Sequence, residues 1–157
     1  FDDSNKKDEQ WYINTNQSFA FADNTVTASY GTATAKAHAD TTWSQDDEDA
    51  GLLPSDKSVN DIKTRGLKYN LIQTLKSQVA GILNDTDWYI TRNTEKSVAI
   101  PSAISTHRDA VRTKQASMET QITNASDTPA LETLYTYTKQ EDGTVTRPLG
   151  ELPTLEI

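Results

Sequence analysis

The strongest constraint on this chain is a pair of long segments that each carry one apolar stripe at helical spacing. In residues 59–83 the apolar side chains recur three and four positions apart, which places them on one face of an α-helix. The members of this stripe are Val59, Ile62, Leu67, Leu71, Ile72, Leu75, Val79, Ile82 and Leu83. Residues 101–124 carry a narrower stripe of Ile104, Val111, Met118 and Ile122. Two such helices with a short connection predict an antiparallel hairpin, and the narrow stripe suits either a helix pair or a coiled coil of several chains.

Capping residues set the expected boundaries of the other helices. A short helix is predicted over residues 87–96, with Thr86 as its N-cap. Proline favours the first turn of a helix, so the second long helix should begin at Pro101, with Ser102 as a capping residue. A third, shorter helix should begin at Thr128. Its apolar and aromatic side chains are Leu131, Leu134, Tyr135 and Tyr137.

The first third of the chain has the pattern of short β-strands. Three apolar or aromatic runs, residues 11–13, 19–21 and 26–30, are divided by turn-forming residues. In the third run apolar residues alternate with threonine and serine, which is the period of a strand with one buried face. A fourth run, residues 32–39, has alanine at every second position and stays open between strand and helix, because alanine also favours helix.

These patterns predict an α+β chain with an antiparallel β-rich front, a helical hairpin with a short third helix, and an extended tail. The front covers residues 1–43, an acidic linker covers 44–57, the helical module covers 58–138 and the tail covers 139–157. Prolines and glycine in the tail disfavour a packed element. Its apolar residues, which can lie along a neighbouring surface, are Leu149, Leu152, Leu155 and Ile157.

The charge of the chain is concentrated at its front. Of the 23 acidic and 15 basic residues, 11 acidic and 3 basic ones lie in residues 1–56, so the formal net charge of −8 belongs to that part. A strongly negative surface disfavours binding to nucleic acid. We interpret the front as a solvated, solubilising surface, with an acidic docking patch for a basic partner as the alternative.

Residues suited to catalysis or metal binding are few. The chain has no cysteine, and its two histidines, His38 and His107, lie far apart in the sequence. The acidic run at residues 46–49 lacks the alternating order of a calcium loop, and no glycine-rich phosphate loop is present. No apolar run approaches the roughly 18 residues of a membrane span. The sequence therefore predicts no enzyme activity, cofactor or metal, and neither a membrane nor a nucleic-acid partner.

The aromatic residues of the front allow one further interpretation. Trp11, Tyr12, Phe19, Phe21 and Tyr30 could form a surface on which sugars stack. In a β-layer with few aliphatic residues, such side chains more often form the core.

A distinctive stretch of residues begins between the two long segments and continues into the second. It consists of Thr86-Asp87-Trp88-Tyr89, Arg92, Glu95, Ile100-Pro101, Arg108 and Val111-Arg112, preceded by Leu83 and followed by Leu131–Tyr135. With these residues, the stretch resembles a helical module of tailed-bacteriophage tail fibre assembly and tail assembly chaperone-like proteins, and of virion proteins of marine phages. The resemblance covers less than half of the chain. Physically, Trp88 is expected to fill the open end of the hairpin and become buried.

The charged residues of this stretch have a structural interpretation of their own. Arg92 and Glu95 are three residues apart, so they should pair on one face of a helix. Arg108 and Arg112 lie one turn apart on the second long helix and should pair with Asp87 or Glu95. The alternative is that these arginines form a docking surface.

The resemblance implies a structural role in a phage virion, in the tail, baseplate or fibre apparatus, by packing and oligomerisation. The expected partners are other phage structural proteins and copies of the chain itself. The expected location is the virion, assembled in the cytoplasm of the bacterial host. A β-rich front and an apolar tail beyond the module favour a built-in part over a transient helper. Two alternatives stay open: a tail fibre assembly chaperone absent from the mature particle, and a carbohydrate-binding receptor module.

Overall fold

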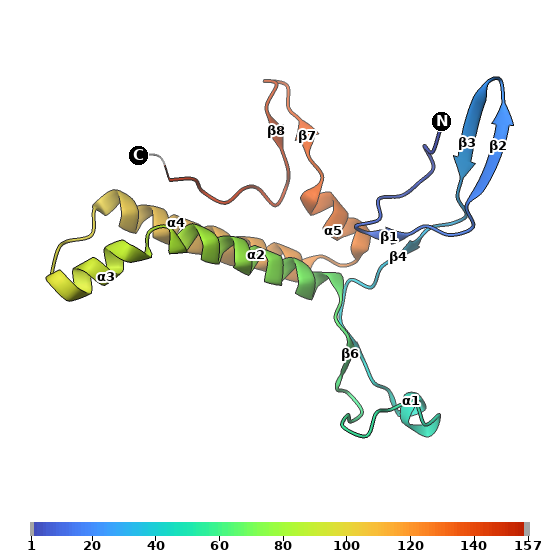
Figure 1. Ribbon diagram of the computed structural model, residues 1–157, viewed down its shortest axis with the longest axis horizontal. Coiled ribbons are helices and arrows are strands. Elements are labelled where there is room, and N and C mark those ends of the chain that lie inside the picture. Colours follow the sequence, from blue (N-terminus) through green and yellow to red (C-terminus); the bar gives the residue numbers. More distant parts are fainter. Residues whose placement is uncertain (1, 156–157) are drawn as a thin grey trace. The chain divides into compact units, whose positions relative to one another are not determined.

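The computed structural model describes residues 2–155 and divides the chain into two compact units. The N-terminal unit consists of residues 2–67 with 126–132, and the helical unit consists of residues 68–125 with 133–155. Along the chain, small antiparallel two-stranded sheets are followed by helices, so the predicted α+β class is confirmed (Figure 1).

Two of the small sheets are built from the front of the N-terminal unit. Strands β2 (Ser18–Ala22) and β3 (Thr25–Ser29) form an antiparallel hairpin. Both residues of its two-residue turn have positive φ angles, 49° and 60°, which match the twist of a tight hairpin. Strand β1 (Tyr12–Ile13) pairs with β4 (Thr34–Ala35), so the alanine-rich run that the sequence leaves open contains a short strand.

A third sheet corrects the predicted start of the first long helix. Strand β5 (Thr41–Thr42) pairs with β6 (Ile62–Thr64), so the helix predicted from Val59 is wrong at its beginning. Both end residues of β6 are β-branched and favour a strand. The carboxylate of Asp40 accepts a hydrogen bond of 2.8 Å from the backbone N–H of Gly66, which fixes the chain just before the helix begins.

The predicted acidic linker contains a short helix, α1 (Gln45–Asp49). A capping box holds its first turn: Asp47 donates its backbone N–H to Ser44 Oγ (3.2 Å), and the Asp47 carboxylate accepts the backbone N–H of Ser44 (3.0 Å). Lys63 Nζ also lies 2.7 Å from Asp47 Oδ1. The Lys63 ammonium and, next, the bonds from Ser44 lower the pKa of Asp47 to about 2.

The N-terminal unit has a small apolar core. Its buried side chains include Trp11, Ala28 and Leu131, which are 3%, 1% and 0% exposed. Leu131 lies on α5 (Thr128–Tyr135), and the first part of this helix belongs to the N-terminal unit although it follows the long helices in sequence. The compact units therefore have different bounds from the predicted segments.

Polar contacts attach the start of α5 to the strands of the N-terminal unit. The hydroxyl of the buried Thr128 donates to the backbone carbonyl of Lys36 (2.6 Å). The hydroxyl of Tyr12 donates to a carboxylate oxygen of Glu132 (2.8 Å), and this bond raises the pKa of the tyrosine. Hydrogen bonds thus supply contacts that the few apolar side chains do not.

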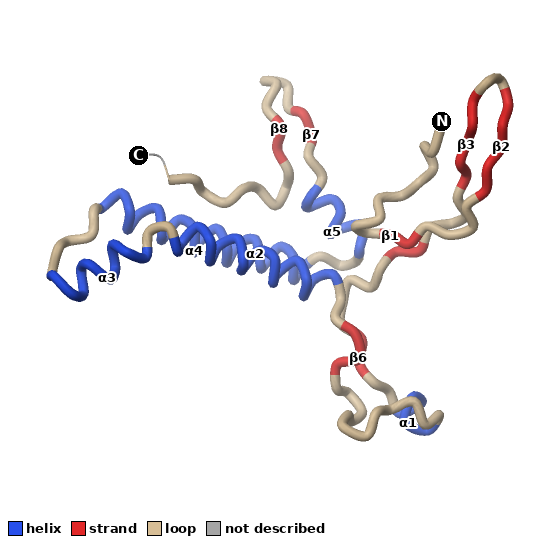
Figure 2. The backbone as a smooth tube through the Cα atoms, viewed as in Figure 1, coloured by secondary structure: helices blue, strands red, loops and turns tan. Residues whose placement is uncertain are grey.

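In the helical unit, α2 (Leu67–Asn84) and α4 (Ser102–Asn124) form the predicted antiparallel pair (Figures 1 and 2). Lys68 Nζ, at the start of α2, donates to the backbone carbonyl of Thr123 at the end of α4 (2.8 Å). All four members of the narrow stripe are buried, namely Ile104, Val111, Met118 and Ile122. The first stripe buries Leu75 and Val79.

Helix α3 (Asp87–Lys96) connects the two long helices and has the predicted bounds. Pro101 is the N-cap residue of α4, and Ser102 is the first residue of that helix. No side-chain hydrogen bond caps α4, so the predicted capping role of Ser102 is wrong. Proline contributes here by its restricted φ and its missing N–H.

The sequence predicts a fully extended C-terminal tail, and this prediction is wrong for its first part. Strands β7 (Thr138–Lys139) and β8 (Val145–Thr146) form a small antiparallel hairpin. Asp142 accepts hydrogen bonds from the backbone N–H and the hydroxyl of Thr144, and Gly143 has a φ of 85°. Asp-Gly is a turn signal, and it outweighs the flexibility suggested by the nearby proline and glycine residues.

The last part of the tail packs on its own unit. Leu149 is 1% exposed, its backbone N–H donates to the carbonyl of Leu134 (3.0 Å), and its carbonyl accepts from Lys114 Nζ (2.9 Å). Residues 152, 153 and 155 are half-buried. Ile157, which the sequence places among the apolar residues of the tail, lies outside the described residues.

Candidate functional site

A buried polar corner connects the end of α2 with α3 and α4. Arg108 is 7% exposed, and its Nη1 donates to the Leu83 carbonyl (2.8 Å) and to Thr86 Oγ1 (2.6 Å). Its Nη2 lies 2.8 Å from Asp87 Oδ1, so the predicted pairing of Arg108 with Asp87 is present. One guanidinium thus satisfies a carbonyl at the C-terminus of α2 and a carboxylate at the N-terminus of α3.

Thr86 belongs to this corner. The sequence predicts that its side chain caps α3, but no side-chain capping bond is formed. Its hydroxyl donates to the Leu83 carbonyl (3.0 Å) and accepts from Arg108. The Thr86 side chain is therefore committed to α2 and α4, and α3 has no side-chain capping bond. The negative charge that favours a helix N-terminus comes instead from Asp87, in the first turn.

Trp88 does not fill the end of the hairpin, so its predicted burial is wrong. Its side chain is 51% exposed. Its ring lies against the ring of Tyr89, with centroids 3.8 Å apart and planes inclined by 32°. The Arg108 corner already closes the turn between α2 and α3, and Trp88 remains on the surface of α3.

Arg92 lies over these two rings; it is half-buried, as is Tyr89, whereas Trp88 is exposed. Its guanidinium carbon is 4.8 Å from the Trp88 ring centroid and 5.6 Å from that of Tyr89, within the range of cation–π contacts. We call Trp88, Tyr89 and Arg92 the aromatic–arginine cluster. The Nε atom of Arg92 is covered and donates to no acceptor within residues 2–155.

The predicted pair of Arg92 and Glu95 is not formed, and within the described chain Arg92 has no carboxylate partner. The other arginines all lie within 4 Å of a carboxylate, in the pairs Arg65–Asp40, Arg108–Asp87, Arg112–Asp109 and Arg147–Glu151. Arg92 is therefore an exception among the five arginines of the chain.

The predicted pairing of Arg112 with Asp87 or Glu95 is wrong. Arg112 lies 3.5 Å from Asp109, three residues earlier on α4, and both side chains are exposed. The predicted residues thus fall into three sets. Thr86, Asp87 and Arg108 form the polar corner. Trp88, Tyr89 and Arg92 form the aromatic–arginine cluster. Glu95, Pro101 and Arg112 lie outside both.

Sequence reasoning missed a cavity beside the corner, within the helical unit. Its volume is about 260 Å³. Its lining residues are Ile82, Asp85, Thr86, His107 and residues 152–155 of the tail. His107 is 8% exposed. The regular spacing of leucines in the tail is the sequence signal that points to this packing.

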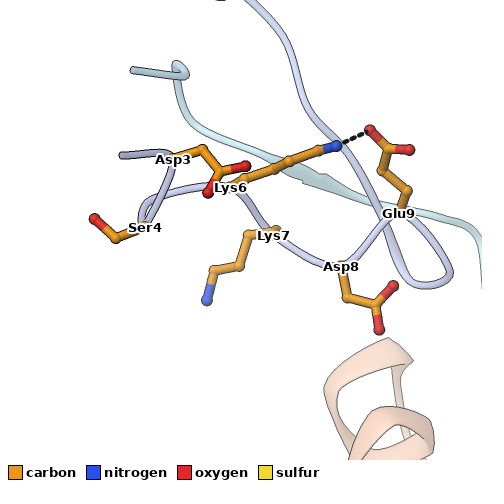
Figure 3. A pocket seen from close by; sticks show the side chains of 6 residues that line it. All are labelled: Asp3, Ser4, Lys6, Lys7, Asp8 and Glu9. Atoms are coloured by element: carbon orange, nitrogen blue, oxygen red, sulfur yellow. Dashed lines mark ion pairs between the residues drawn. The ribbon is translucent and has the colours of Figure 1, made fainter. Parts of the chain in front are cut away.

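A second hollow lies in the N-terminal unit, along residues 3–9. It has a volume of about 560 Å³, and its lining is almost entirely charged (Figure 3). Lys6 Nζ pairs with Glu9 Oε1 (2.9 Å), whereas Lys7 and Asp8 point away from that pair. Both signs of charge are present and do not converge on one point, which is the arrangement of a solvated loop.

Other kinds of site can be checked against the described residues. Within residues 2–155, no three histidine or acidic side chains gather as a metal site would require. No helix in that range combines the length and the apolar character needed to cross a membrane. No family model, curated protein or solved structure matches this chain. The aromatic–arginine cluster is the candidate functional site, because Trp88 is exposed and Arg92 has no carboxylate partner within residues 2–155.

Proposed function

We propose that this chain is a structural component of a bacteriophage virion, in the tail, baseplate or fibre apparatus, and that it works by packing without catalysis. The observation that carries the proposal is the exposed aromatic–arginine cluster. It lies in the stretch that resembles tail-associated phage proteins. Tryptophan, tyrosine and arginine are the residues most enriched at the centres of protein interfaces.

The surface area of the chain supports a role in assembly. The accessible surface is 10526 Å² for a mass of 17.4 kDa. Two independent globules that share this mass would together expose about 9,500 Å², by the usual scaling of surface with mass. The chain therefore exposes more surface than two separate globules would, and contact with partners is a natural way to bury the excess.

The β2–β3 hairpin adds an exposed apolar surface to the N-terminal unit. Phe19 and Phe21 are 64% and 71% exposed, and they pair across the hairpin with Ala28 and Val26. Within residues 2–155, β3 is the only strand paired with β2. An open strand edge next to exposed phenylalanines favours association, so proteins usually cover such an edge.

The carbohydrate-binding alternative is weakened by the position of Trp11. This residue is 3% exposed, so it is not available as a platform on which a sugar ring could stack. The assembly-chaperone alternative predicts the same exposed cluster. It differs from the proposal in the fate of the chain after assembly.

Mass spectrometry of purified mature particles tests the proposal. The particles come from the phage that encodes the chain, and infected-cell lysate serves as the comparison. A built-in part appears in the particles at a fixed copy number relative to a known capsid or tail protein. If the chain occurs in the lysate but is absent from washed particles, the structural proposal fails and the chaperone alternative replaces it.

A further inference from the structure

We propose that the aromatic–arginine cluster on α3 binds the acidic helix α1 of a second copy of this chain. The inference rests on the proposed structural function and names the surface and partner through which copies associate. Two observations carry it. Within residues 2–155, one arginine beside the exposed Trp88 lacks a carboxylate, and the exposed helix α1 has carboxylates that lack cations.

The geometry of Arg92 leaves its donors available. Stacking on Trp88 and Tyr89 uses the flat face of the guanidinium, whereas hydrogen bonds to a carboxylate use its edge. Nε is covered, so the edge that can reach a partner is the one formed by the two terminal nitrogens. The rings also hold the side chain in place, which reduces the entropy lost when a carboxylate binds.

The same face of α3 carries a second cation. Trp88, Arg92 and Lys96 are spaced by four residues, so they follow one another along one side of the helix. Within residues 2–155, Lys96 has no ion pair. The face therefore presents an aromatic side chain followed by two cations, which suits a short segment with several carboxylates.

Helix α1 has the complementary chemistry. None of its residues is buried. Asp47 is bound by Lys63, but Asp46, Glu48 and Asp49 have no cationic partner within the described chain. The capping box already holds the helix in shape, so docking orders little additional backbone.

The charge distribution favours α1 as the occupant. The negative excess of the chain lies in residues 1–56, where α1 supplies four consecutive acidic residues, 46–49. Between copies, contact of an acidic front with a basic face reduces like-charge repulsion and orients the approach. Exposed ion pairs are weak and screened by salt, so the association is expected to be modest and strongest at low ionic strength.

Sedimentation velocity of the full chain tests the inference, over a range of protein concentrations at about 20 mM and about 500 mM salt. The unmodified chain should self-associate at low salt and dissociate at high salt. Arg92→Glu combined with Lys96→Glu should weaken association at least about tenfold, because like charges then face each other. Asp46→Lys, Glu48→Lys and Asp49→Lys together should do the same, and combining both sets should restore association.

Matched controls separate this contact from general charge effects and from misfolding. Arg112→Glu reverses an exposed charge outside the cluster and should leave association within about twofold of the unmodified chain. Circular dichroism should show the same helix content in every variant. Trp88→Ala should weaken association, because it removes the platform under Arg92.

Three results would overturn the inference. They are a chain that stays monomeric at all concentrations at low salt, association that the two charge reversals leave unchanged, and charge reversals that weaken association but do not restore it when combined. These results are independent of particle composition. A chain found in mature particles that fails this test would retain the structural function and lose only the α1–α3 contact.

Discussion

The helical unit and the N-terminal unit are each stabilised internally by different interactions. In the helical unit, four apolar side chains of one narrow stripe are between 0% and 4% exposed along α4. In the N-terminal unit, short strands of two to five residues surround a few buried side chains, and long-range hydrogen bonds attach α5. A periodic apolar stripe gives one large stabilising term, whereas the front depends on several small ones.

This difference explains which surfaces are available for partners. None of the residues of α3 is buried, although Asp87 in its first turn pairs with Arg108. The strands of the front also leave phenylalanine side chains exposed. Exposed side chains on α3 and β2 are therefore accessible to other chains.

The largest effect is expected for Ile122→Ala in the helical unit. Ile122 is 0% exposed, and its truncation should lower the free energy of unfolding by about 4 kcal/mol through lost burial and a residual cavity. Urea unfolding followed by circular dichroism at 222 nm measures this. The matched control is Val145→Ala, on the exposed hairpin, with a loss below about 0.5 kcal/mol. Similar losses for the two variants would contradict the assigned core.

The next effect is expected for Arg108→Met at the polar corner. Methionine retains much of the volume but removes the hydrogen bonds from Arg108 to the Leu83 carbonyl and the Thr86 hydroxyl, and it removes the cation beside Asp87. The Leu83 carbonyl keeps its bonds from Thr86. Because Asp87 is half exposed and can be hydrated, the loss should be about 2–3 kcal/mol, below that of a fully buried ion pair. Arg112→Met is the control and should change stability by less than about 0.5 kcal/mol.

A smaller effect is expected for Thr128→Val in the N-terminal unit. The substitution preserves shape and removes the hydroxyl that donates to the Lys36 carbonyl. The loss should be about 1–2 kcal/mol, because the site is buried and the carbonyl loses a partner. Hydrogen exchange of the amides in β1 and β4 should report the loosening before α4 does. Simultaneous loosening of both units would contradict the separation drawn between them.

Trp88→Ala should have little effect on folding. An exposed tryptophan on α3 contributes mainly its contacts with Tyr89 and Arg92, so the free energy of unfolding should fall by less than about 1 kcal/mol. Urea unfolding of this variant beside Ile122→Ala gives the comparison. A loss as large as that of Ile122→Ala would place Trp88 in the core, as the sequence alone suggests.

The smallest effect concerns the acidic helix. The pKa of Asp47 is lowered to about 2 by Lys63 and Ser44, so its stabilising contribution is fully present above the ordinary pKa of an aspartate, 3.8. The contribution is lost as the pH falls through the folded pKa near 2, and α1 should loosen between these values. In Lys63→Gln, the pKa of Asp47 should rise toward 3.8, which carbon-13 NMR of the carboxyl group measures. An unchanged pKa would show that Lys63 does not hold this carboxylate.

The sequence predicts the parts of the fold that periodicity controls. The four stripe residues of α4 are buried as expected, and the bounds of α3 follow its local sequence pattern. The start of α2 could not be found in this way, because β6 depends on pairing with β5, about twenty residues earlier. The tail hairpin was missed because its Asp-Gly turn lies among residues that also suit an extended chain.

The candidate site was predicted in part. Pairing between Arg108 and Asp87 follows from residue types near a helix junction, and it is present. The exposure of Trp88 could not be predicted, since an aromatic at such a corner is buried only if no other group closes the turn. Here the guanidinium of Arg108 and the Thr86 hydroxyl close it. That Arg92 alone lacks a carboxylate within residues 2–155 follows from the three-dimensional contacts of all five arginines, which the sequence does not contain.

Oxidative footprinting of the three tryptophans tests the central claim most directly, with mass spectrometry applied to the free chain and to purified particles. In the free chain, Trp88 should be oxidised readily and Trp11 slowly, as their exposed fractions of 51% and 3% require. In the particles, Trp88 should become protected while Trp11 is unchanged, because the cluster is then covered by a partner. Particles in which the chain is present and Trp88 is oxidised as fast as in the free chain would contradict the account.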